Sequence, residues 1–247
     1  MIKGGIKMNI AIISGASRGI GKAIATELDK ENLDELWFIC RSYEDKGEYK
    51  TPVRHFSLDL STSSFAETIK SALSEGEYNI RYLVCSAGVG YMGEVANASL
   101  TEIDSMISIN CTALTLLTGI CLPNMSEGAK ILEIASGAGF LPQPRFAVYA
   151  ASKSYVISLS RALRKELKPR KICVTAICPG PVDTEFFSAL NPPEYKKKYV
   201  ISAKKVAKKA VKSAKKGKAI CSPTLSIKLV HLASKLLPTS LLLKFYK

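Results

Sequence analysis

Short apolar runs alternate with segments of helical periodicity along most of the chain. Helices are expected after Gly19, from Ser61 to Ser74 and from Ala147 to Leu167. Seven apolar runs are expected to be strands, and they lie at Met8–Ser14, Glu35–Cys40, Val53–Leu58, Ile80–Ser86, Lys130–Ala135, Ile172–Ile177 and Lys218–Cys221. Such alternation indicates βαβ units, which build a parallel sheet with helices on both faces.

Several of these runs are apolar almost without interruption, which is typical of strands whose two faces are both covered. The pattern therefore predicts an α/β fold: a single domain with a doubly wound, mostly parallel, seven-stranded Rossmann-type sheet. In such a sheet, ligands bind at the carboxyl ends of the strands. We expect this domain at residues 8–221, preceded by an extension at 1–7 and followed by a basic amphipathic tail at 222–247.

The last quarter of the chain carries the clearest helical pattern. Ser202 is the expected N-cap of a helix that runs to Lys216, with Gly217 just past its end. Its apolar stripe consists of Val206, Ala207, Ala210, Val211 and Ala214, and its other face carries seven lysines: 204, 205, 208, 209, 212, 215 and 216. The simplest interpretation is a helix that packs on the sheet and exposes its lysines to solvent.

From Leu225 to Lys247, apolar residues are interleaved with four lysines, and Pro238 interrupts the pattern. No apolar run in this tail approaches the about 18 residues of a membrane span. A basic amphipathic segment can instead lie on an anionic membrane surface. It could equally dock an acidic acyl carrier protein, a CoA phosphate or an oligomer partner. Nucleic acid is not expected, because the tail lacks arginine and interleaved aromatic residues.

Charge separates the tail from the body even more sharply than hydropathy does. The net charge is +14, yet residues 1–194 hold 20 basic and 21 acidic residues. Residues 195–247 hold 15 lysines and no acidic residue. The body is therefore close to neutral, and the whole positive excess lies in the C-terminal fifth.

Composition otherwise suits one globular domain, with 47% hydrophobic and 23% charged residues in 247. Seven cysteines without a C-x-x-C pair are expected to be reduced thiols in a cytoplasmic protein, and the tail could add a peripheral membrane contact. No signal peptide is evident. With two histidines and no cluster of zinc-ligand spacing, no metal site is expected.

A glycine-rich turn, S-G-A-S-R-G-I-G from Ser14 to Gly21, follows the first strand and opens a helix. Gly15, Gly19 and Gly21 allow backbone N–H groups to approach a pyrophosphate, which the positive end of the helix also favours. The turn therefore predicts a dinucleotide site.

A second group of residues points to redox chemistry on a carbonyl or an alcohol. Tyr149 and Lys153 lie one helical turn apart, so both side chains share a face, and Ser136 lies thirteen residues before Tyr149. An ammonium beside a phenol is expected to lower the tyrosine pKa from about 10 toward neutral pH. Such a phenol could protonate a nascent alkoxide.

Taken together, these separated motifs resemble the short-chain dehydrogenase/reductase family, specifically its classical branch, over residues 8–185. The spacing G-x-x-x-G-x-G is the family's, and Ser14 stands where threonine is usual. Cys85-Ser86-Ala87-Gly88 stands for the family's N-N-A-G motif. Both asparagines are replaced there, which puts the sheet-bracing contact of that motif in question.

The resemblance implies roles for four catalytic residues. Tyr149 would donate a proton to the substrate oxygen, and Lys153 would lower its pKa and hold the nicotinamide ribose. Ser136 would polarise the carbonyl, and Asn110 would support a water relay to Lys153. The family's members are usually dimers or tetramers, so a homodimer or homotetramer is expected.

It also implies a cofactor site. Asp59 matches the residue at the adenine, and Thr184, after Pro179-Gly180, matches the one that holds the nicotinamide amide. The full candidate set is Gly15, Ser17, Arg18, Gly19, Ile20, Gly21, Arg41, Asp59, Ala87, Gly88, Tyr149, Lys153, Pro179, Gly180, Val182 and Thr184.

Charge at the end of the second strand bears on the choice of cofactor. An NAD enzyme usually places an acid there to bind the ribose 2′-hydroxyl. This chain has Arg41, and its first acid comes only at Glu44. An arginine there could instead bind the 2′-phosphate of NADPH, and Arg18 could reach the same phosphate. We therefore expect NADP(H) to be preferred, with NAD(H) as the alternative.

Residues 185–200 match the family's substrate lid. Phe186, Phe187 and Leu190 would make its inner surface apolar, with Tyr91, Phe140, Leu141 and Phe146 adding to the wall. The expected function is an NADPH-dependent carbonyl reductase or alcohol dehydrogenase for a hydrophobic ketone or aldehyde, such as a 3-oxoacyl or steroid-like lipid. The alternative is a non-catalytic NADPH-binding regulator or scaffold that is tethered through its lysine-rich tail.

Overall fold

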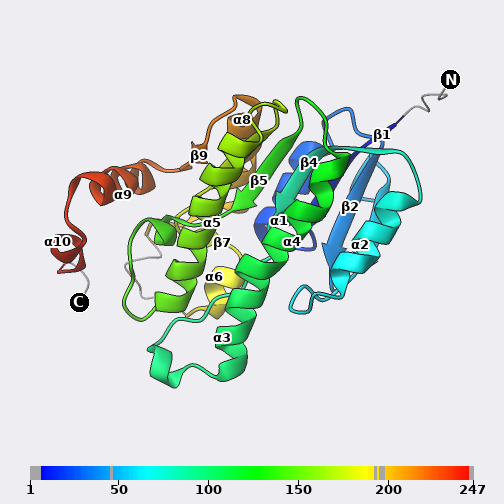
Figure 1. The fold of residues 1–247 in the computed structure, drawn as a ribbon. Coiled ribbons are helices and arrows are strands. Elements are labelled where there is room, and N and C mark those ends of the chain that lie inside the picture. Colours follow the sequence, from blue (N-terminus) through cyan, green and yellow to red (C-terminus); the bar gives the residue numbers. More distant parts are fainter. Residues whose placement is uncertain (1–6, 45–46, 192–193, 195–197, 245–247) are drawn as a thin grey trace.

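A seven-stranded parallel sheet forms the centre of the molecule (Figure 1). The computed structural model describes residues 7–44, 47–191, 194 and 198–244. The strand order is β3-β2-β1-β4-β5-β6-β9, and every pair is parallel. The strands are β1 (Met8–Ser14), β2 (Glu35–Cys40), β3 (Val53–Ser57), β4 (Tyr78–Cys85), β5 (Lys130–Ile134), β6 (Cys173–Ile177) and β9 (Ile220–Cys221). The predicted fold class is confirmed, and strand ends differ from the prediction by two residues at most.

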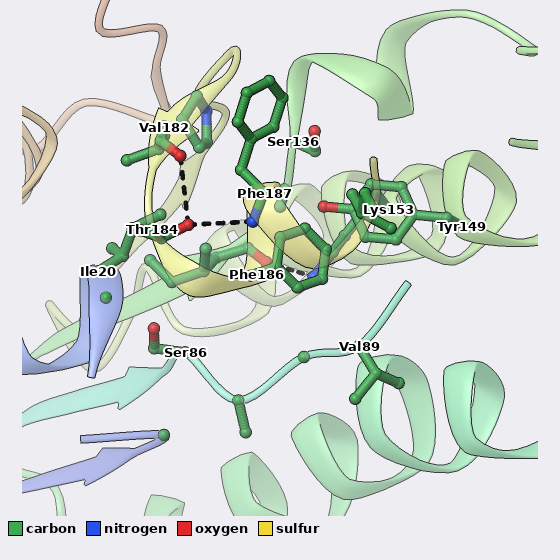
Figure 2. A pocket seen from close by; sticks show the side chains of 18 of the residues that line it. Ile20, Ser86, Val89, Ser136, Tyr149, Lys153, Val182, Thr184, Phe186 and Phe187 are labelled. Atoms are coloured by element: carbon green, nitrogen blue, oxygen red, sulfur yellow. Dashed lines mark hydrogen bonds between the residues drawn. The ribbon is translucent and has the colours of Figure 1, made fainter. Parts of the chain in front are cut away.

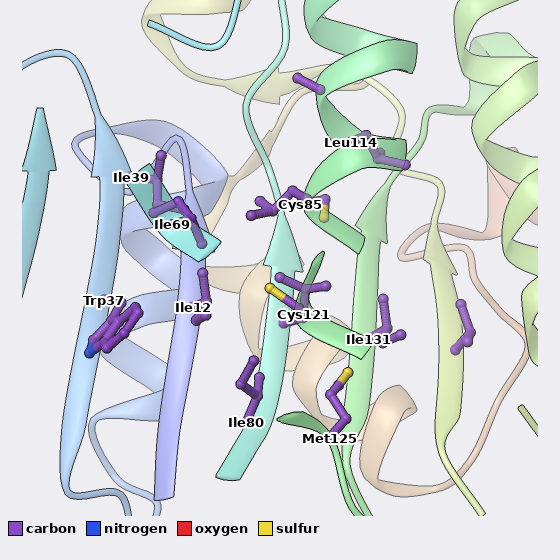
Figure 3. Close-up of a cluster of buried hydrophobic side chains, with 14 of the residues drawn as sticks. Ile12, Trp37, Ile39, Ile69, Ile80, Cys85, Leu114, Cys121, Met125 and Ile131 are labelled. Atoms are coloured by element: carbon purple, nitrogen blue, oxygen red, sulfur yellow. The ribbon is translucent and has the colours of Figure 1, made fainter. Parts of the chain in front are cut away.

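Helices cover both faces of this sheet (Figure 1). One face carries α2 (Phe65–Ser74), α4 (Leu114–Cys121) and α5 (Ala147–Glu166), and the other carries α1 (Gly19–Leu28) and α8 (Ala203–Lys215). The strands are apolar on both sides because each side meets helices. In β1, Ile10 and Ile12 join the cluster under α2 and α4, whereas Ala11 and Ile13 join the cluster under α1 and α8. Figure 3 shows the first cluster around Trp37, Cys85 and Ile131.

The remaining elements lie mostly at the carboxyl ends of the strands or close the chain. They include η1 (Val95–Asn97), η4 (Gly137–Phe140), β7 (Val182–Asp183), α6 (Glu185–Ala189), β8 (Ile201–Ser202), α9 (Leu225–Leu236) and α10 (Thr239–Leu243). β7 and β8 pair in parallel as a separate small sheet. The division of the chain at residues 7 and 221 stays a prediction.

One continuous helical run, Leu100–Asn124, is long and apolar enough to cross a membrane by length and composition. It consists of α3 (Leu100–Ile107), a π-helical stretch η2 (Ser108–Ala113), α4 and η3 (Leu122–Asn124). Met106, Leu114, Leu117 and Cys121 are buried inside the molecule. Of the 18-residue apolar stretch in this run, 39% is buried. The run packs on β4, α2 and α5, so its apolar side is used as part of the core.

α8 forms as the sequence predicts. Ser202 is the N-cap, and its Oγ accepts a hydrogen bond from the backbone N–H of Lys205 at 3.3 Å. Gly217 has φ +64° just beyond the end of the helix. All five residues of the predicted apolar stripe are buried.

Strand order reverses between β1 and β4, because the chain builds β1, β2 and β3 to one side and then returns to place β4 on the other. Loops that leave neighbouring strands in opposite directions open a crevice there, and ligands of such sheets bind in it. The candidate site lies at this crevice.

Candidate functional site

A cavity of about 1600 Å³ opens at the carboxyl ends of the central strands. Loops after β1, β2, β3, β4, β5 and β6 line it, together with α6 and parts of α9 and α10. Of the sequence-predicted site residues, all but two lie on its wall. The two exceptions, Gly21 and Asn110, are buried behind the wall and support it.

The glycine turn fits a close-packed anion site at the start of α1. Gly15 has φ +66°, and a Cβ there would lie 2.8 Å from the backbone nitrogen of Ala87. A Cβ on Gly21 would lie 2.1 Å from the carbonyl oxygen of Gly15. These two positions therefore require glycine, because a side chain at Gly15 would push the β4 loop away and one at Gly21 would push α1 away from the turn after β1.

The amino end of α1 faces the cavity without a side-chain cap. Its N-cap is Arg18, whose side chain makes no capping hydrogen bond. The first N–H groups of a helix are therefore open to an anion, which the helix dipole also favours. This donor set fits the pyrophosphate of a dinucleotide.

Ser14 braces the loop that follows β4. Its Oγ accepts hydrogen bonds from the backbone N–H groups of Ser86 at 3.0 Å and Ala87 at 3.2 Å. Ser14 therefore ties β1 to the loop after β4, and whether the replaced asparagines leave their own contact unmade stays a prediction. Cys85, in place of the first asparagine, lies buried with its Sγ 3.7 Å from Thr118 Oγ1.

Tyr149, Lys153 and Ser136 come together on one wall of the cavity (Figure 2). Tyr149 and Lys153 occupy successive turns of α5, and Lys153 Nζ lies 5.6 Å from the centroid of the Tyr149 ring. Ser136 follows β5, and its hydroxyl is close enough to Tyr149 to lower the pKa of the phenol. Ser136 Oγ also accepts from the backbone N–H of Ala138 at 3.1 Å.

The pKa of Tyr149 shifts in the opposite direction to the one expected from the sequence. Burial raises it to about 12, and the nearby Ser136 hydroxyl offsets only part of that shift. The Tyr149 ring stacks on Phe146 at 4.3 Å, so little solvent reaches it to stabilise a phenolate. The expectation of a lowered tyrosine pKa is therefore wrong for this state, and the phenol is protonated at neutral pH.

Burial also acts on the lysine. It lowers the pKa of Lys153 to about 8, because the charged ammonium loses its hydration. Lys153 Nζ donates a hydrogen bond to the carbonyl oxygen of Ile134 at 2.9 Å, which fixes it beneath the tyrosine.

Asn110 lies in the π-helical stretch η2 and organises the loop after β4. Its Oδ1 accepts from the N–H of Val89 at 3.0 Å, and its Nδ2 donates to Val89 O at 2.9 Å and Ser152 Oγ at 3.0 Å. A Cβ on Gly88 would lie 3.1 Å from Asn110 Oδ1 and 3.4 Å from Lys153 Nζ. Gly88 therefore allows the asparagine and the lysine to approach each other, and the predicted water relay stays a prediction.

Thr184 serves as the N-cap of α6 (Figure 2). Its Oγ1 donates to Val182 O at 3.2 Å and accepts from the N–H of Phe187 at 3.4 Å. Pro179 O accepts from the N–H of Gly137 at 2.8 Å, which ties the segment after β6 to the one after β5. These bonds hold the 179–187 segment beside the start of α1, where a Cβ on Gly19 would lie 3.3 Å from Thr184 Cγ2.

The two arginines of the cofactor prediction have different surroundings. Arg41 lies near Asp59, and its charge contributes to the lowered pKa of that carboxyl, whose main cause is the hydrogen bond from the backbone N–H of Ser61. Arg18 instead pairs with Glu185 of α6, and both side chains are exposed. In this conformation Arg18 therefore links α1 to the lid, a contact that the sequence did not indicate.

Much of the predicted apolar wall is present. Phe186, Phe187, Leu190, Leu141 and Phe146 line the cavity. Tyr91 and Phe140 are not among the lining residues, so the prediction was wrong for these two. Phe140 stacks on His231 of α9 at 4.2 Å, and Tyr91 packs against the cluster around Phe146 and Tyr149. Part of the predicted lid, residues 192–193 and 195–197, lies outside the described residues.

Sequence reasoning missed the contribution of the C-terminal helices to this cavity. Ser226, Ile227, Val230 and Ala233 of α9 and Leu242 of α10 all line it. The spacing of Ile227 and Val230 is a helical signal, but the leucines of the same segment give an equally good stripe on another face. Only the packing of Ile227 over Gly137 and Gly180 distinguishes the inward face.

Comparisons with known proteins agree on one family. A family model described as short chain dehydrogenase matches residues 9–194. An uncharacterized oxidoreductase of Staphylococcus epidermidis is 29% identical over 198 residues, which cover 78% of this chain and 86% of that protein. The human very-long-chain 3-oxoacyl-CoA reductase is 30% identical over 196 residues, which cover 74% of this chain and 62% of that longer protein.

Solved structures share the fold. A short-chain dehydrogenase from Sphingobium yanoikuyae in complex with NADPH superposes with a TM-score of 0.78 at 22% identity, over 97% of this chain and 96% of that one. A Burkholderia phymatum short chain dehydrogenase/reductase in complex with NAD gives 0.77 at 21% identity, over 93% and 95%.

Proposed function

The chain belongs to the short chain dehydrogenase family and is an oxidoreductase that acts on CH–OH or C=O groups, and we propose that it is an NADPH-preferring reductase of hydrophobic ketones or aldehydes. The observation that carries this proposal is the grouping of Tyr149, Ser136 and Lys153 on the wall of a cavity whose other walls combine an anion site with apolar side chains.

The chain's own residues would handle the oxygen of the substrate. A bound nicotinamide cofactor supplies the hydride. Ser136 Oγ would hold the carbonyl oxygen, and Tyr149, protonated at neutral pH because burial raises its pKa, would donate the proton from its Oη to that oxygen. The ammonium of Lys153 would stabilise the phenolate that remains.

NADPH preference is supported by charge at the end of β2. Arg41 lines the cavity where an NAD enzyme usually has an acid, and Lys22 lies on the same wall. Glu48 neutralises Lys22 in an ion pair of 2.7 Å, so Arg41 is the better candidate for a 2′-phosphate. NADH remains the alternative cofactor, since one solved relative of the same fold holds NADPH and another NAD.

A hydrophobic substrate is supported by the lining of the cavity near Tyr149. Phe186 lies 5.8 Å from the Tyr149 ring, and Leu190, Phe146 and Ile227 continue this apolar wall. A sugar would leave its hydroxyls unpaired there. The 3-oxoacyl-CoA reductase among the relatives points in the same direction, toward lipid-like ketones.

The test is cofactor oxidation across a panel of hydrophobic ketones, 3-oxoacyl esters and steroid ketones, with Tyr149→Phe as the matched variant. We expect turnover by the wild type and a loss of at least about 100-fold in kcat for Tyr149→Phe, with NADPH binding retained. Tight NADPH binding without turnover of any ketone would contradict the proposal and favour a cofactor-binding regulator.

The pH profile gives a second readout of the same site. The buried Lys153 has a pKa lowered to about 8, and its protonated form is the one that stabilises a phenolate. We therefore expect ketone reduction to hold below about pH 8 and to fall as the pH rises through that value. A profile that stays flat to about pH 10 would exclude this role of Lys153.

Cofactor preference is tested with Arg41→Ala and with Arg18→Ala as the comparison. We expect Arg41→Ala to raise the KM for NADPH about tenfold or more and to leave the KM for NADH nearly unchanged. Arg18→Ala should change both less, because Arg18 pairs with Glu185. Equal effects of Arg41→Ala on both cofactors would contradict the preference.

We also propose a homo-oligomer. Support comes from a shallow apolar groove between the α3–α4 run and α5, where Ile107 and Tyr155 are exposed. Sedimentation velocity of Tyr155→Glu against the wild type tests it. A wild type that sediments as a monomer at micromolar concentration would contradict it.

A further inference from the structure

Helix α9 carries a stripe of exposed leucines. Leu225, Leu229, Leu232 and Leu236 are exposed by 71, 57, 53 and 71%. Their spacing of four, three and four residues places them on one face of the helix. Large apolar side chains exposed in a continuous row mark a surface that meets an apolar partner.

The opposite face of α9 is apolar as well, and it is in use. Ile227, Val230 and Ala233 line the candidate cavity, and His231 stacks on Phe140. One face of the helix therefore forms a wall of the cavity, while the other presents leucines to the outside. In Figure 1, α9 and α10 lie at the edge of the molecule, beyond the end of the sheet.

The chain segment that carries the stripe has charges of a single sign. Residues 195–247 contain no acidic residue. Lys228 and Lys235 flank the leucines on α9, and both are exposed. Lys244 follows α10, in which Leu241 is also exposed, by 41%.

We propose that α9 and α10 lie on an anionic lipid surface, with the leucine stripe inserted among the acyl chains and the lysines among the headgroups. A helix with leucines on one face and flanking lysines binds such surfaces through apolar burial and attraction to anionic lipids. Because the inner face of α9 lines the cavity, this docking places the cavity beside the membrane. A lipid-like ketone could enter the cavity from the membrane, and this last step rests on the proposed function.

Charge favours a lipid surface over a second copy of this chain. Two copies joined through the stripe would bring their lysines together, and this segment has no acidic residue to pair with them. A lipid surface offers both the apolar interior and the negative charge that the stripe and its lysines require. An acidic carrier protein would satisfy the lysines but would leave the leucines without an obvious partner.

The experiment is co-sedimentation of the full-length protein with vesicles of equal parts phosphatidylglycerol and phosphatidylcholine. Neutral phosphatidylcholine vesicles are the reference. We expect binding to the anionic vesicles, weaker binding to the neutral ones, and a decrease as salt rises to about 0.5 M. The double variant Leu229→Ser/Leu232→Ser should bind the anionic vesicles about tenfold less tightly.

A matched control removes two exposed apolar side chains elsewhere. Val95 and Leu100 are exposed by 47 and 85% and lie before and at the start of α3. Val95→Ser/Leu100→Ser should bind vesicles as the wild type does. Circular dichroism of both double variants should match the wild type, since neither pair belongs to the core.

Several outcomes would overturn the inference. If the wild type does not bind anionic vesicles at low salt, the lipid surface is excluded and an acidic carrier protein becomes the alternative partner. Binding that survives Leu229→Ser/Leu232→Ser, but is lost in Lys204→Glu/Lys208→Glu, would place the contact on α8. A change of oligomeric state in Leu229→Ser/Leu232→Ser would make the stripe an interface between copies.

Activity assays keep this inference separate from the proposed function. Leu229→Ser/Leu232→Ser should turn over a water-soluble ketone as the wild type does and lose efficiency only with a ketone held in vesicles. If no ketone is turned over while vesicle binding still depends on the stripe, the proposed function fails and the lipid surface stands.

Discussion

Helices α8 and α9 are close in sequence, yet they are packed very differently. Both mix apolar residues with lysines, and both begin at a hydroxyl N-cap. In α8 the apolar stripe is buried against α1 and the sheet. In α9 none of the residues is buried, and the leucines face outward.

The difference lies in how many faces of each helix are apolar. α8 has one apolar stripe and one lysine face, so a single packing surface satisfies it. α9 has an inner stripe on the cavity and an outer stripe of leucines, and the fold covers only the first. A helix of the second kind belongs to the cavity wall and to the surface at the same time.

The largest expected difference is in global stability. Val206 of α8 is fully buried, so Val206→Ser should lower the free energy of unfolding by about 3 kcal/mol through lost packing and an unpaired hydroxyl. Leu229→Ser in α9 should change it by less than about 0.5 kcal/mol. Urea unfolding of both variants measures this, and similar losses would mean that the outer face of α9 is part of the core.

Substitutions on the two faces of α9 should have different effects on the KM of the enzyme. Ile227→Ser removes a side chain that lines the cavity, so the KM for a soluble hydrophobic ketone should rise about tenfold. Leu232→Ser on the outer face should leave that KM unchanged. An equal effect of the two variants would show that α9 does not hold the orientation described above.

Removing the N-cap hydroxyl should affect global unfolding in α8 but only local opening in α9. Ser202 Oγ accepts from the N–H of Lys205 at 3.3 Å, and Thr224 Oγ1 accepts from that of Ile227 at 3.4 Å. Ser202→Ala should lower global stability by about 1 kcal/mol, because α8 belongs to the core. Thr224→Ala should speed hydrogen exchange in α9 alone, since α9 opens locally. A loss of global stability in Thr224→Ala would contradict that independence.

The smallest expected effect is a pH dependence in the docking of α9. Burial lowers the pKa of His231, and the charges of Lys235 and Arg161 lower it further. When docking lowers the pKa of a histidine, the docked state gains stability at pH values above the ordinary histidine pKa. That stability is lost as the pH falls through the lowered pKa of the docked state. Docking of α9 on Phe140 should therefore weaken as the pH falls below about 6.5, the ordinary histidine pKa.

Hydrogen exchange of the α9 amides, with α8 as the internal reference, measures this change. His231→Phe keeps the stacked ring and should remove the pH dependence. A pH dependence that persists in His231→Phe would assign it to another group.

Much of the site could be predicted because its signals are local. The glycine turn, the spacing of Tyr149 and Lys153, and the position of Ser136 after a strand each depend on a few neighbouring residues. Strand ends in a parallel sheet converge on one edge, so these segments meet whenever the sheet forms. Their meeting at one cavity therefore followed from the order of the strands.

What could not be predicted depends on burial and on contacts between distant segments. The pKa of Tyr149 rises because Phe146 and the surrounding wall exclude water, and this effect outweighs any help from Lys153. Arg18 meets Glu185, which lies 167 residues away along the chain. Neither contact has a signature within a short window of sequence.

The sequence by itself determined the strands, the parallel sheet, α8 with its caps, and the local motifs around Gly15, Ser136 and Tyr149 that meet at the cavity. Hydrophobic period, glycine conformation and capping act over a few residues, so they are readable without coordinates. Only the tertiary structure decided which face of α9 lines the cavity, which aromatic residues reach its wall and how far Tyr149 is desolvated. These properties depend on distant segments that pack together, and packing is set by the fold as a whole.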